Sequence, residues 1–202
     1  MSDLPSVAPP GAEEGAPRSI FLVGMMGAGK STIARLLAAA ANFEFIDADG
    51  EVARRAGASI STIFELEGEA AFRARESQLL GELCLRPRIV LATGGGAILT
   101  AHNRELLRQN GLVVFLEASA DEIARRTRKD TGRPLLSGAT GDERRARIEA
   151  LLAHREPLYR EVAQLVFRSA ANSPKRLVEA IFAHPRVAAM LAHAAVEGGR
   201  QP

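Results

Sequence analysis

The chain has 202 residues, of which 47% are hydrophobic and 25% charged, and its formal net charge is +2. This balance is typical of a globular protein with one sizeable core, and it excludes collagen-like, low-complexity and repeat architectures. A net charge near zero and an aromatic content of 4% also argue against a nucleic-acid partner, which needs a strong basic surface and stacking side chains.

The composition also predicts where the protein acts. No apolar run approaches the roughly 18 residues of a membrane-spanning helix, and the N-terminus lacks the apolar centre of a signal peptide. Cys84 is the single cysteine, so no intramolecular disulfide can form, and its apolar neighbours indicate a small buried residue. We therefore expect a cytoplasmic protein without a membrane partner.

Residues 1–17 are rich in Pro, Gly, Ala and Glu, which predicts a disordered tail. From Ser19 onward, short apolar runs alternate with longer helical stretches, as in β/α units around a parallel sheet. The expected strands are 19–23, 43–46, 88–92, 112–117 and 164–167. The expected helices are 30–41, 48–57, 61–83, 101–110, 119–128, 141–163 and 174–183, and a further helical stretch lies at 187–196.

Several helix ends carry their own signals. Ser119 with Glu122, and Thr140 with Glu143, have the spacing of capping boxes, in which the two side chains bind free N–H groups of the first turn. Gly111 is expected to end the preceding helix in a left-handed conformation. These residues are interpreted as structural.

The segment "GMMGAGKS" matches the phosphate-binding pattern G-x-x-x-x-G-K-[ST], and it lies between an expected strand and an expected helix. Glycines let the backbone fold around phosphates, and the helix N-terminus supplies N–H donors. Lys30 would reach the β- and γ-phosphates and Ser31 would bind Mg²⁺. The residues expected to contact the nucleotide are Gly27, Ala28, Gly29, Lys30, Ser31 and Thr32.

Two acidic residues end the second strand. Asp47 and Asp49 should lie at the carboxyl edge of the sheet, near the phosphate loop. One carboxylate can support Mg²⁺ while the other positions an acceptor hydroxyl as a general base. Considered alone, the two residues could equally be caps of the next helix.

Further on, Arg73 and Glu76 lie three residues apart on one helical face, a spacing that by itself favours a surface ion pair. Three glycines, Gly94, Gly95 and Gly96, follow the third strand, where bare backbone would admit a ligand. Arg155 lies on a helix that Pro157 is expected to break. Arg73 and Arg155 together could hold a carboxylate.

Between the expected helices 119–128 and 141–163, a polar loop carries Arg133, and Arg126 and Arg128 immediately precede it. A mobile basic flap would exclude water and neutralise charge on a transferred phosphoryl group. An exposed loop with incidental arginines is the alternative interpretation. The proline that follows Arg133 in "GRPLL" favours the flap.

In order and spacing, these segments resemble the shikimate kinase family from about Ser19 to Ala183. The resemblance rests on "LVGMMGAGKST", "FIDADGEV", "IFELEGEAAFRARE", "TGGGAI", "RPLL" and "REPLYREVA". It implies an α/β fold with a five-stranded parallel sheet flanked by helices, a P-loop kinase of the nucleoside monophosphate kinase type. It also implies transfer of the γ-phosphoryl group of ATP to the 3-hydroxyl of shikimate in aromatic amino acid biosynthesis.

The resemblance implies a role for each matched residue. Lys30, Asp49 and Arg133 would be catalytic, and Ser31 and Asp47 would serve the metal. The residues implied to bind shikimate are Asp49, Arg73, Gly94, Gly95, Gly96 and Arg155, and Arg126 and Pro174 are implied to flank the adenine.

The implied organisation is a tail at 1–17, a kinase domain at 18–183 and a C-terminal helix and tail at 184–202. Within the kinase domain, a substrate-binding insertion would span about 48–83 and a lid about 127–140. The protein is expected to be a monomer whose ligands are ATP, Mg²⁺ and shikimate. The tail and the last helix are departures from the family pattern.

Other functions fit the sequence less well. The guanine-binding motif N-K-x-D of GTPases is missing, and the third strand runs into glycines instead of the metal-binding acid of many hydrolytic ATPases. Gluconate and nucleoside monophosphate kinases share the phosphate loop, but they do not explain two arginines ready for a carboxylate. A nucleotide-binding module without turnover would not need Lys30, Asp49, Arg73, Arg133 and Arg155 together.

Overall fold

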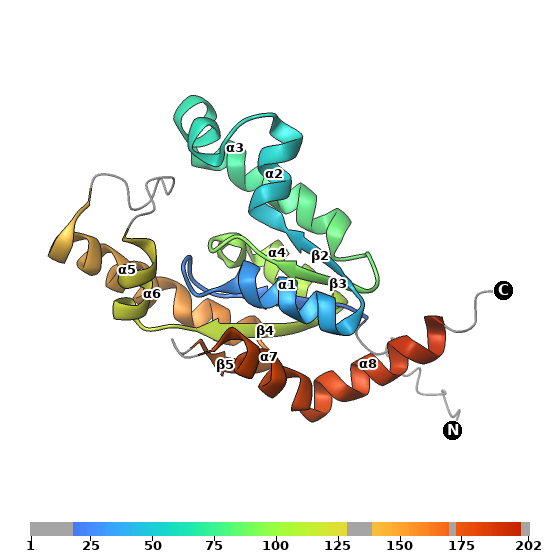
Figure 1. The fold of residues 1–202 in the computed structure, drawn as a ribbon. Coiled ribbons are helices and arrows are strands. Elements are labelled where there is room, and N and C mark those ends of the chain that lie inside the picture. The colour runs from blue at the N-terminus through green and yellow to red at the C-terminus, as the bar shows by residue number, and fades with distance from the viewer. Residues whose placement is uncertain (1–17, 129–138, 170–172, 199–202) are drawn as a thin grey trace, which may run out of the picture.

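The computed structural model describes residues 18–128, 139–169 and 173–198 (Figure 1). The expected tail at 1–17 and most of the expected lid lie outside the described residues. The strands are β1 (Ile20–Val23), β2 (Glu44–Asp47), β3 (Ile89–Ala92), β4 (Leu112–Glu117) and β5 (Leu165–Arg168). The helices are α1 (Lys30–Ala41), α2 (Ala48–Ala56), α3 (Ile60–Leu83), α4 (Ala101–Asn110), α5 (Ala120–Thr127), α6 (Gly141–Val162), α7 (Pro174–Ala183) and α8 (Pro185–Gly198), with a short 3₁₀ helix η1 at Ala97–Leu99.

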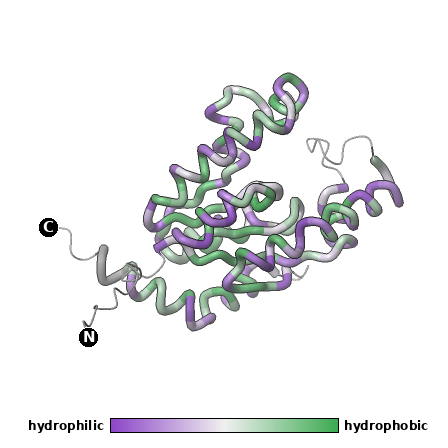
Figure 2. The backbone as a smooth tube through the Cα atoms, turned by 180° about the vertical axis from the view of Figure 1, so that it is seen from behind, coloured by the Kyte–Doolittle hydropathy of each residue, from purple (hydrophilic) through white to green (hydrophobic). Residues whose placement is uncertain are grey.

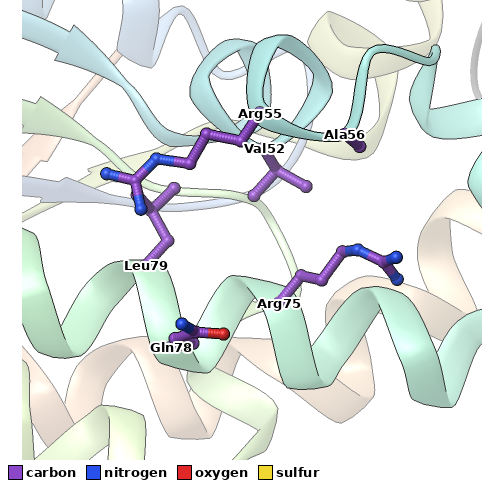
Figure 3. Close-up of a pocket in the computed structure, with 6 residues that line it drawn as sticks. All are labelled: Val52, Arg55, Ala56, Arg75, Gln78 and Leu79. Atoms are coloured by element: carbon purple, nitrogen blue, oxygen red, sulfur yellow. The ribbon is translucent and has the colours of Figure 1, made fainter.

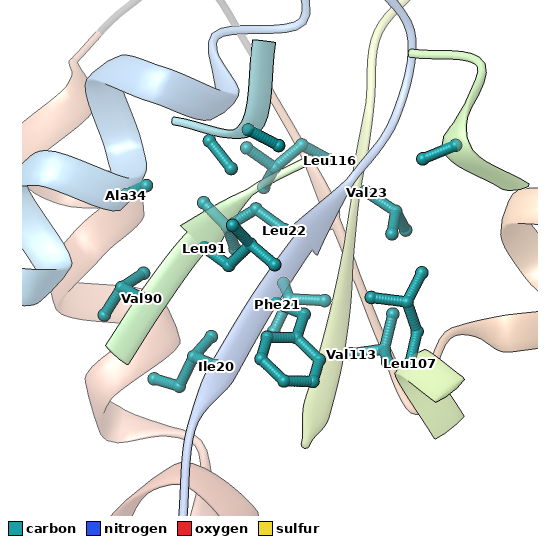
Figure 4. Packing of buried hydrophobic residues seen from close by; sticks show 14 of the residues in the cluster. Ile20, Phe21, Leu22, Val23, Ala34, Val90, Leu91, Leu107, Val113 and Leu116 are labelled. Atoms are coloured by element: carbon teal, nitrogen blue, oxygen red, sulfur yellow. The ribbon is translucent and has the colours of Figure 1, made fainter. Parts of the chain in front are cut away.

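The five strands form one parallel sheet in the order β2-β3-β1-β4-β5, which confirms the expected fold class. The three inner strands are apolar and almost completely buried, because helices cover both faces of a parallel sheet (Figure 4). The edge strands β2 and β5 have several partly exposed or exposed residues. Because all the strands are parallel, their five carboxyl ends meet at one edge of the sheet.

Helices cover the sheet in two layers. Helices α1 and α7 pack together, and α1 also packs on β2 and β3, whereas α4 and α6 pack on β4. Helices α2 and α3 project from the sheet on one side, and α5 and the start of α6 extend on the other (Figure 1). Hydrophobic residues concentrate in the central strands and hydrophilic residues on the outer helices (Figure 2). None of the described helices is long and apolar enough to cross a membrane.

One of the two predicted capping boxes is present. Ser119 accepts a hydrogen bond from the Glu122 backbone N–H, and the Glu122 carboxylate accepts one from the Ser119 backbone. The prediction for Thr140 was wrong, since that residue precedes α6 without a side-chain cap hydrogen bond. Gly111 was also misinterpreted, because it is extended, with φ −164°. A glycine is needed at this position because the Cβ of any other residue would overlap the ring of Phe21.

Two helices differ from expectation. In α3, Gly68 is not helical (φ 83°, ψ 169°), so the helix is interrupted there. In α6, Pro157 lies within a helix that continues to Val162, although it was expected to break it. Arg155 and Tyr159 are buried on either side of Pro157, and this packing outweighs the loss of one helical hydrogen bond.

The C-terminal helix α8 packs against α7, and its Val187 and Met190 are buried in the core. Arg88, which directly precedes β3, donates a hydrogen bond to the carbonyl oxygen of Ala194 at 3.2 Å. Cys84 is 2% exposed, and burial raises the pKa of its thiol to about 12. This confirms its interpretation as a small buried residue with little reactivity.

Candidate active site

The phosphate loop joins β1 to α1 at the carboxyl edge of the sheet. Gly29 adopts a left-handed conformation (φ 96°) just before the first helical residue, Lys30. The Lys30 ammonium is held in the loop, where it donates to the carbonyl oxygens of Gly24 at 2.8 Å and Met25 at 3.0 Å. The first turn of α1 contains no acidic residue, so the positive end of the helix dipole is available for an anion.

Arg126 and Ser169 hold the other side of this loop. The Arg126 guanidinium, on α5, donates to the carbonyl oxygens of Gly27 at 3.2 Å and Ala28 at 3.3 Å. It also binds the Ser169 hydroxyl at 3.1 Å and the Ser169 carbonyl oxygen at 2.8 Å. The Ser169 hydroxyl in turn donates to the Ala28 carbonyl oxygen at 2.6 Å. Helix α5 and the residue after β5 are therefore tied to the backbone of the phosphate loop.

The other described residues expected on the nucleotide side lie at the starts of α1 and α7. Ser31 is half-buried in the first turn of α1, next to the exposed Thr32. Pro174 is the exposed first residue of α7, which Ser173 caps. That Pro174 and Arg126 flank the adenine stays a prediction. Arg133 lies outside the described residues.

The two acidic residues after β2 have different surroundings. Asp47 is the N-cap of α2, and its Oδ1 accepts from the Gly50 N–H at 3.2 Å, which confirms the capping interpretation for this residue. Asp49 is half-buried and reaches the glycine triplet: its Oδ1 lies 2.6 Å from the place where a Gly94 Cβ would be. With Ser31, these residues offer hard oxygen donors at the carboxyl edge, which fits Mg²⁺.

Side chains from other segments surround the glycine triplet after β3. A Cβ on Gly94 would overlap the carboxylates of Glu76 and Asp49, and one on Gly96 would overlap the guanidinium of Arg73. The missing side chains therefore make room for these charged groups. The expectation that the triplet borders a ligand stays a prediction, but its neighbours are now identified.

Arg73 and Glu76, on α3, form a partly buried ion pair, which rules out the alternative of an exposed surface pair for these two residues. Arg73 Nη1 lies 2.7 Å from Glu76 Oε2, and the Glu76 side chain is 1% exposed. Burial raises the pKa of Glu76, and the charges of Arg73 and Arg155 partly offset this effect. Burial by itself would lower the pKa of Arg73, but the carboxylates of Glu76 and Glu69 outweigh this effect and raise it.

Arg155 approaches the same triplet from α6. It is 3% exposed, and its Nη1 lies 3.4 Å from the carbonyl oxygen of Gly95. Its Nε, like Oε1 of Glu76, is buried without a hydrogen-bond partner among the described residues. Buried polar atoms of this kind are costly, and a bound polar ligand would satisfy them. Arg73 and Arg155 thus come from different helices to neighbouring glycines.

Three residues of this arrangement were not predicted to be functional. Glu76 shares a helical face with Arg73, and Tyr159 lies one turn after Arg155, so helical spacing was the available signal. Ser169 directly follows β5, at the edge where ligands of parallel sheets bind. Glu76 and Tyr159 lie within the segments "IFELEGEAAFRARE" and "REPLYREVA" that carry the family resemblance, whereas Ser169 lies in no such segment.

A pocket of about 380 Å³ lies elsewhere, between α2 and α3 (Figure 3). Val52 and Leu79 belong to its lining, with Arg55 and Arg75 also bordering it. Arg55 is paired with Glu51 and Glu82, and Arg75 with Glu67. The charged groups around the glycine triplet do not line this pocket.

Comparison with known proteins gives one consistent result. The family model described as shikimate kinase matches residues 26–185. A shikimate kinase of Bordetella avium is 54% identical over 162 residues, covering 80% of this chain and 76% of the relative. One of Nitrosospira multiformis is 49% identical over 169 residues, covering 84% and 85%. The structure of shikimate kinase from Acinetobacter baumannii in complex with shikimate is 40% identical, with a TM-score of 0.78, and the match covers 92% of this chain and 96% of that one.

Proposed function

This chain belongs to the shikimate kinase family, and we propose that its site transfers the γ-phosphoryl group of ATP to the 3-hydroxyl of shikimate. The products are ADP and shikimate 3-phosphate, on the route to chorismate and the aromatic amino acids. The family supports the reaction as a whole. The assignment of each step to particular residues is our proposal.

On the nucleotide side, the backbone N–H groups of residues 27–32 and the Lys30 ammonium bind the phosphates. Lys30 already lies in the loop, held by carbonyl oxygens of Gly24 and Met25, so little reorganisation is needed when ATP binds. Arg126 stacks on one face of the adenine and Pro174 on the other. Arg133, in the lid, neutralises charge on the transferred group.

On the acceptor side, Arg73 and Arg155 bind the carboxylate of shikimate. Arginine suits this task because its planar guanidinium can give two parallel hydrogen bonds to a carboxylate. The unpartnered Nε of Arg155 supports this assignment, since a carboxylate oxygen would satisfy it. The glycine triplet lines the ring hydroxyls.

Asp49 orients the 3-hydroxyl and accepts its proton. The hydroxyl oxygen then forms a bond to the γ-phosphorus while the bond to the bridging oxygen of ADP breaks, so the negative charge ends on ADP. Ser31 and, through the outer shell, Asp47 would hold Mg²⁺, which supplies charge neutralisation at the phosphates when bound. The oxygen donors at this edge fit that ion.

The observation that carries this proposal is the meeting of two arginines and Asp49 at one glycine triplet, beside a phosphate loop. We also propose that the protein acts as a monomer and is located in the cytoplasm. The single buried thiol of Cys84 supports the cytoplasmic location.

The test is ADP release by the purified full chain with ATP and Mg²⁺, with and without shikimate. We expect strong stimulation by shikimate and none by gluconate or nucleoside monophosphates. Stimulation by another acceptor would retain the kinase but reassign the two arginines. Absence of stimulation by any acceptor would favour a nucleotide-binding module.

A further inference from the structure

Tyr159 is a fully buried polar side chain at the site that the proposed reaction does not use. It is 0% exposed and the largest of the fully buried side chains among the described residues. It lies on α6, one helical turn after Arg155, so both side chains lie on the same face of the helix. Its place next to a substrate-binding arginine suggests a role beyond packing.

The hydroxyl of Tyr159 donates a short hydrogen bond, 2.5 Å long, to the carbonyl oxygen of Gly95. Its ring stacks on Phe115 of β4, with centroids 5.1 Å apart and an angle of 23° between the planes. The stack holds the ring in place, so the hydroxyl is aimed at Gly95 with little freedom. Burial also raises the pKa of the phenol, which keeps the hydroxyl protonated as a donor.

The carbonyl group of Gly95 belongs to the same peptide unit as the N–H of Gly96. Because a trans peptide is planar, this N–H points away from the Tyr159 hydroxyl. On its other side, Gly95 is confined by the phosphate loop, since a Cβ would lie 3.2 Å from the backbone nitrogen of Met26. The peptide is therefore held between α6 and the phosphate loop.

Arg155 uses the same carbonyl oxygen, with its Nη1 at 3.4 Å. This contact is long, and the Nε of the same guanidinium has no hydrogen-bond partner among the described residues, so the group can still donate to a ligand. The Tyr159 hydroxyl provides the shorter contact to the same oxygen. The Gly95 carbonyl therefore remains satisfied when Arg155 moves to bind a carboxylate.

We propose that Tyr159 is a positioning residue for the acceptor: its hydroxyl fixes the peptide between Gly95 and Gly96 and thereby orients the Gly96 N–H and frees Arg155 for the carboxylate. This inference rests on the proposed function, because it assigns the carboxylate of shikimate to this place. A residue with a packing role alone would need only the ring, since burying a hydroxyl without use is unfavourable.

The test is Tyr159→Phe in the full chain, which keeps the ring and its stack on Phe115 and removes only the hydroxyl. We expect the Kd and KM of shikimate to rise about three- to tenfold, the effect of one net hydrogen bond. The Kd of ADP with Mg²⁺ should not change. Titration calorimetry with shikimate and with Mg²⁺–ADP measures both Kd values, which do not depend on the fraction of inactive protein.

A matched control is Ser19→Ala. Ser19 is also completely buried, and its hydroxyl donates to the Arg86 carbonyl oxygen at 2.8 Å, but it precedes β1 at the opposite edge of the sheet. This variant should lose stability without changing either Kd. Equal changes of both Kd values in Tyr159→Phe, or no change, would overturn the inference. Failure of the wild-type chain to bind or phosphorylate shikimate would instead overturn the proposed function.

Discussion

The nucleotide side and the acceptor side of the site are built in different ways. The phosphate loop is one contiguous stretch whose own backbone holds Lys30, through carbonyl oxygens five and six residues earlier in the chain. The acceptor side is assembled from α2, α3, the loop after β3 and α6, and its charged groups meet where glycines leave room for them. The hold on Lys30 depends on local conformation, although Arg126 and Ser169 brace the loop from distant segments. The acceptor side depends throughout on packing between distant segments.

Because the two sides are built separately, binding of ATP and binding of shikimate should respond to different substitutions. Changes at the acceptor side should alter the KM of shikimate and leave nucleotide binding intact. Changes around the loop should do the reverse. Single substitutions on each side, with matched controls, test this division.

Asp49→Asn lies where the two sides meet and should have the largest effect. Loss of a general base lowers kcat by about 10²- to 10⁴-fold, and the carboxamide keeps the size of the side chain. Steady-state kinetics measures kcat, and thermal unfolding checks that the variant is as stable as the wild type. The control is Glu51→Gln, on the same helix but in surface ion pairs with Arg54 and Arg55, which should leave kcat unchanged. Near-normal turnover of Asp49→Asn would remove Asp49 from its role.

Arg155→Ala tests the acceptor side alone. Loss of charge-assisted hydrogen bonds should raise the KM of shikimate about 10- to 100-fold, with a much smaller change for ATP. Arg160→Ala, on the same helix, removes an exposed side chain paired with Glu156 and Glu117 and should change neither value. If Arg155→Ala weakens ATP and shikimate equally, the carboxylate assignment is wrong.

Ser169→Ala tests the nucleotide side. It removes the donor to the Ala28 carbonyl oxygen and one partner of Arg126, so the KM of ATP should rise about three- to tenfold. The KM of shikimate should not change, and Ser169→Thr should restore ATP binding. Ser119→Ala is the control, because it weakens the cap of the helix that carries Arg126 without touching the loop. A shift in shikimate binding alone would contradict this division of the site.

The contributions of Glu76 and Glu122 to the stability of the fold should depend on pH with opposite signs. Burial raises the pKa of Glu76, so its contribution to stability is complete below the ordinary pKa of 4.5 and is lost as the pH rises through the folded-state pKa. The backbone N–H of Ser119 lowers the pKa of Glu122, so its contribution is present above 4.5 and is lost as the pH falls through the folded-state pKa.

Urea unfolding of the wild type, Glu76→Gln and Glu122→Gln across this pH range measures both effects. Relative to the wild type, Glu76→Gln should gain stability as the pH rises, and Glu122→Gln should gain as the pH falls. These are the smallest effects in the series. The same sign of pH dependence in both variants would show that burial does not control Glu76.

Much of the fold could be predicted from the sequence because its signals are local. Apolar runs mark the five strands, and the helix from Lys30 to Ala41 was predicted with its observed bounds. The errors occurred where packing decides. Gly111 is required by the ring of Phe21, not by a left-handed turn, and α6 continues through Pro157 because buried residues flank it.

The phosphate loop, its place between a strand and a helix, and the family could be recognised from the sequence, because a contiguous motif is visible along the chain before it folds. The assembly of the acceptor side became evident only in the folded protein. It buried Glu76 beside Arg73, brought Arg155 to Gly95 and aimed the Tyr159 hydroxyl at the same carbonyl oxygen. These contacts join residues up to 64 positions apart, and only the packing of α3 and α6 around the sheet brings such residues within hydrogen-bond distance.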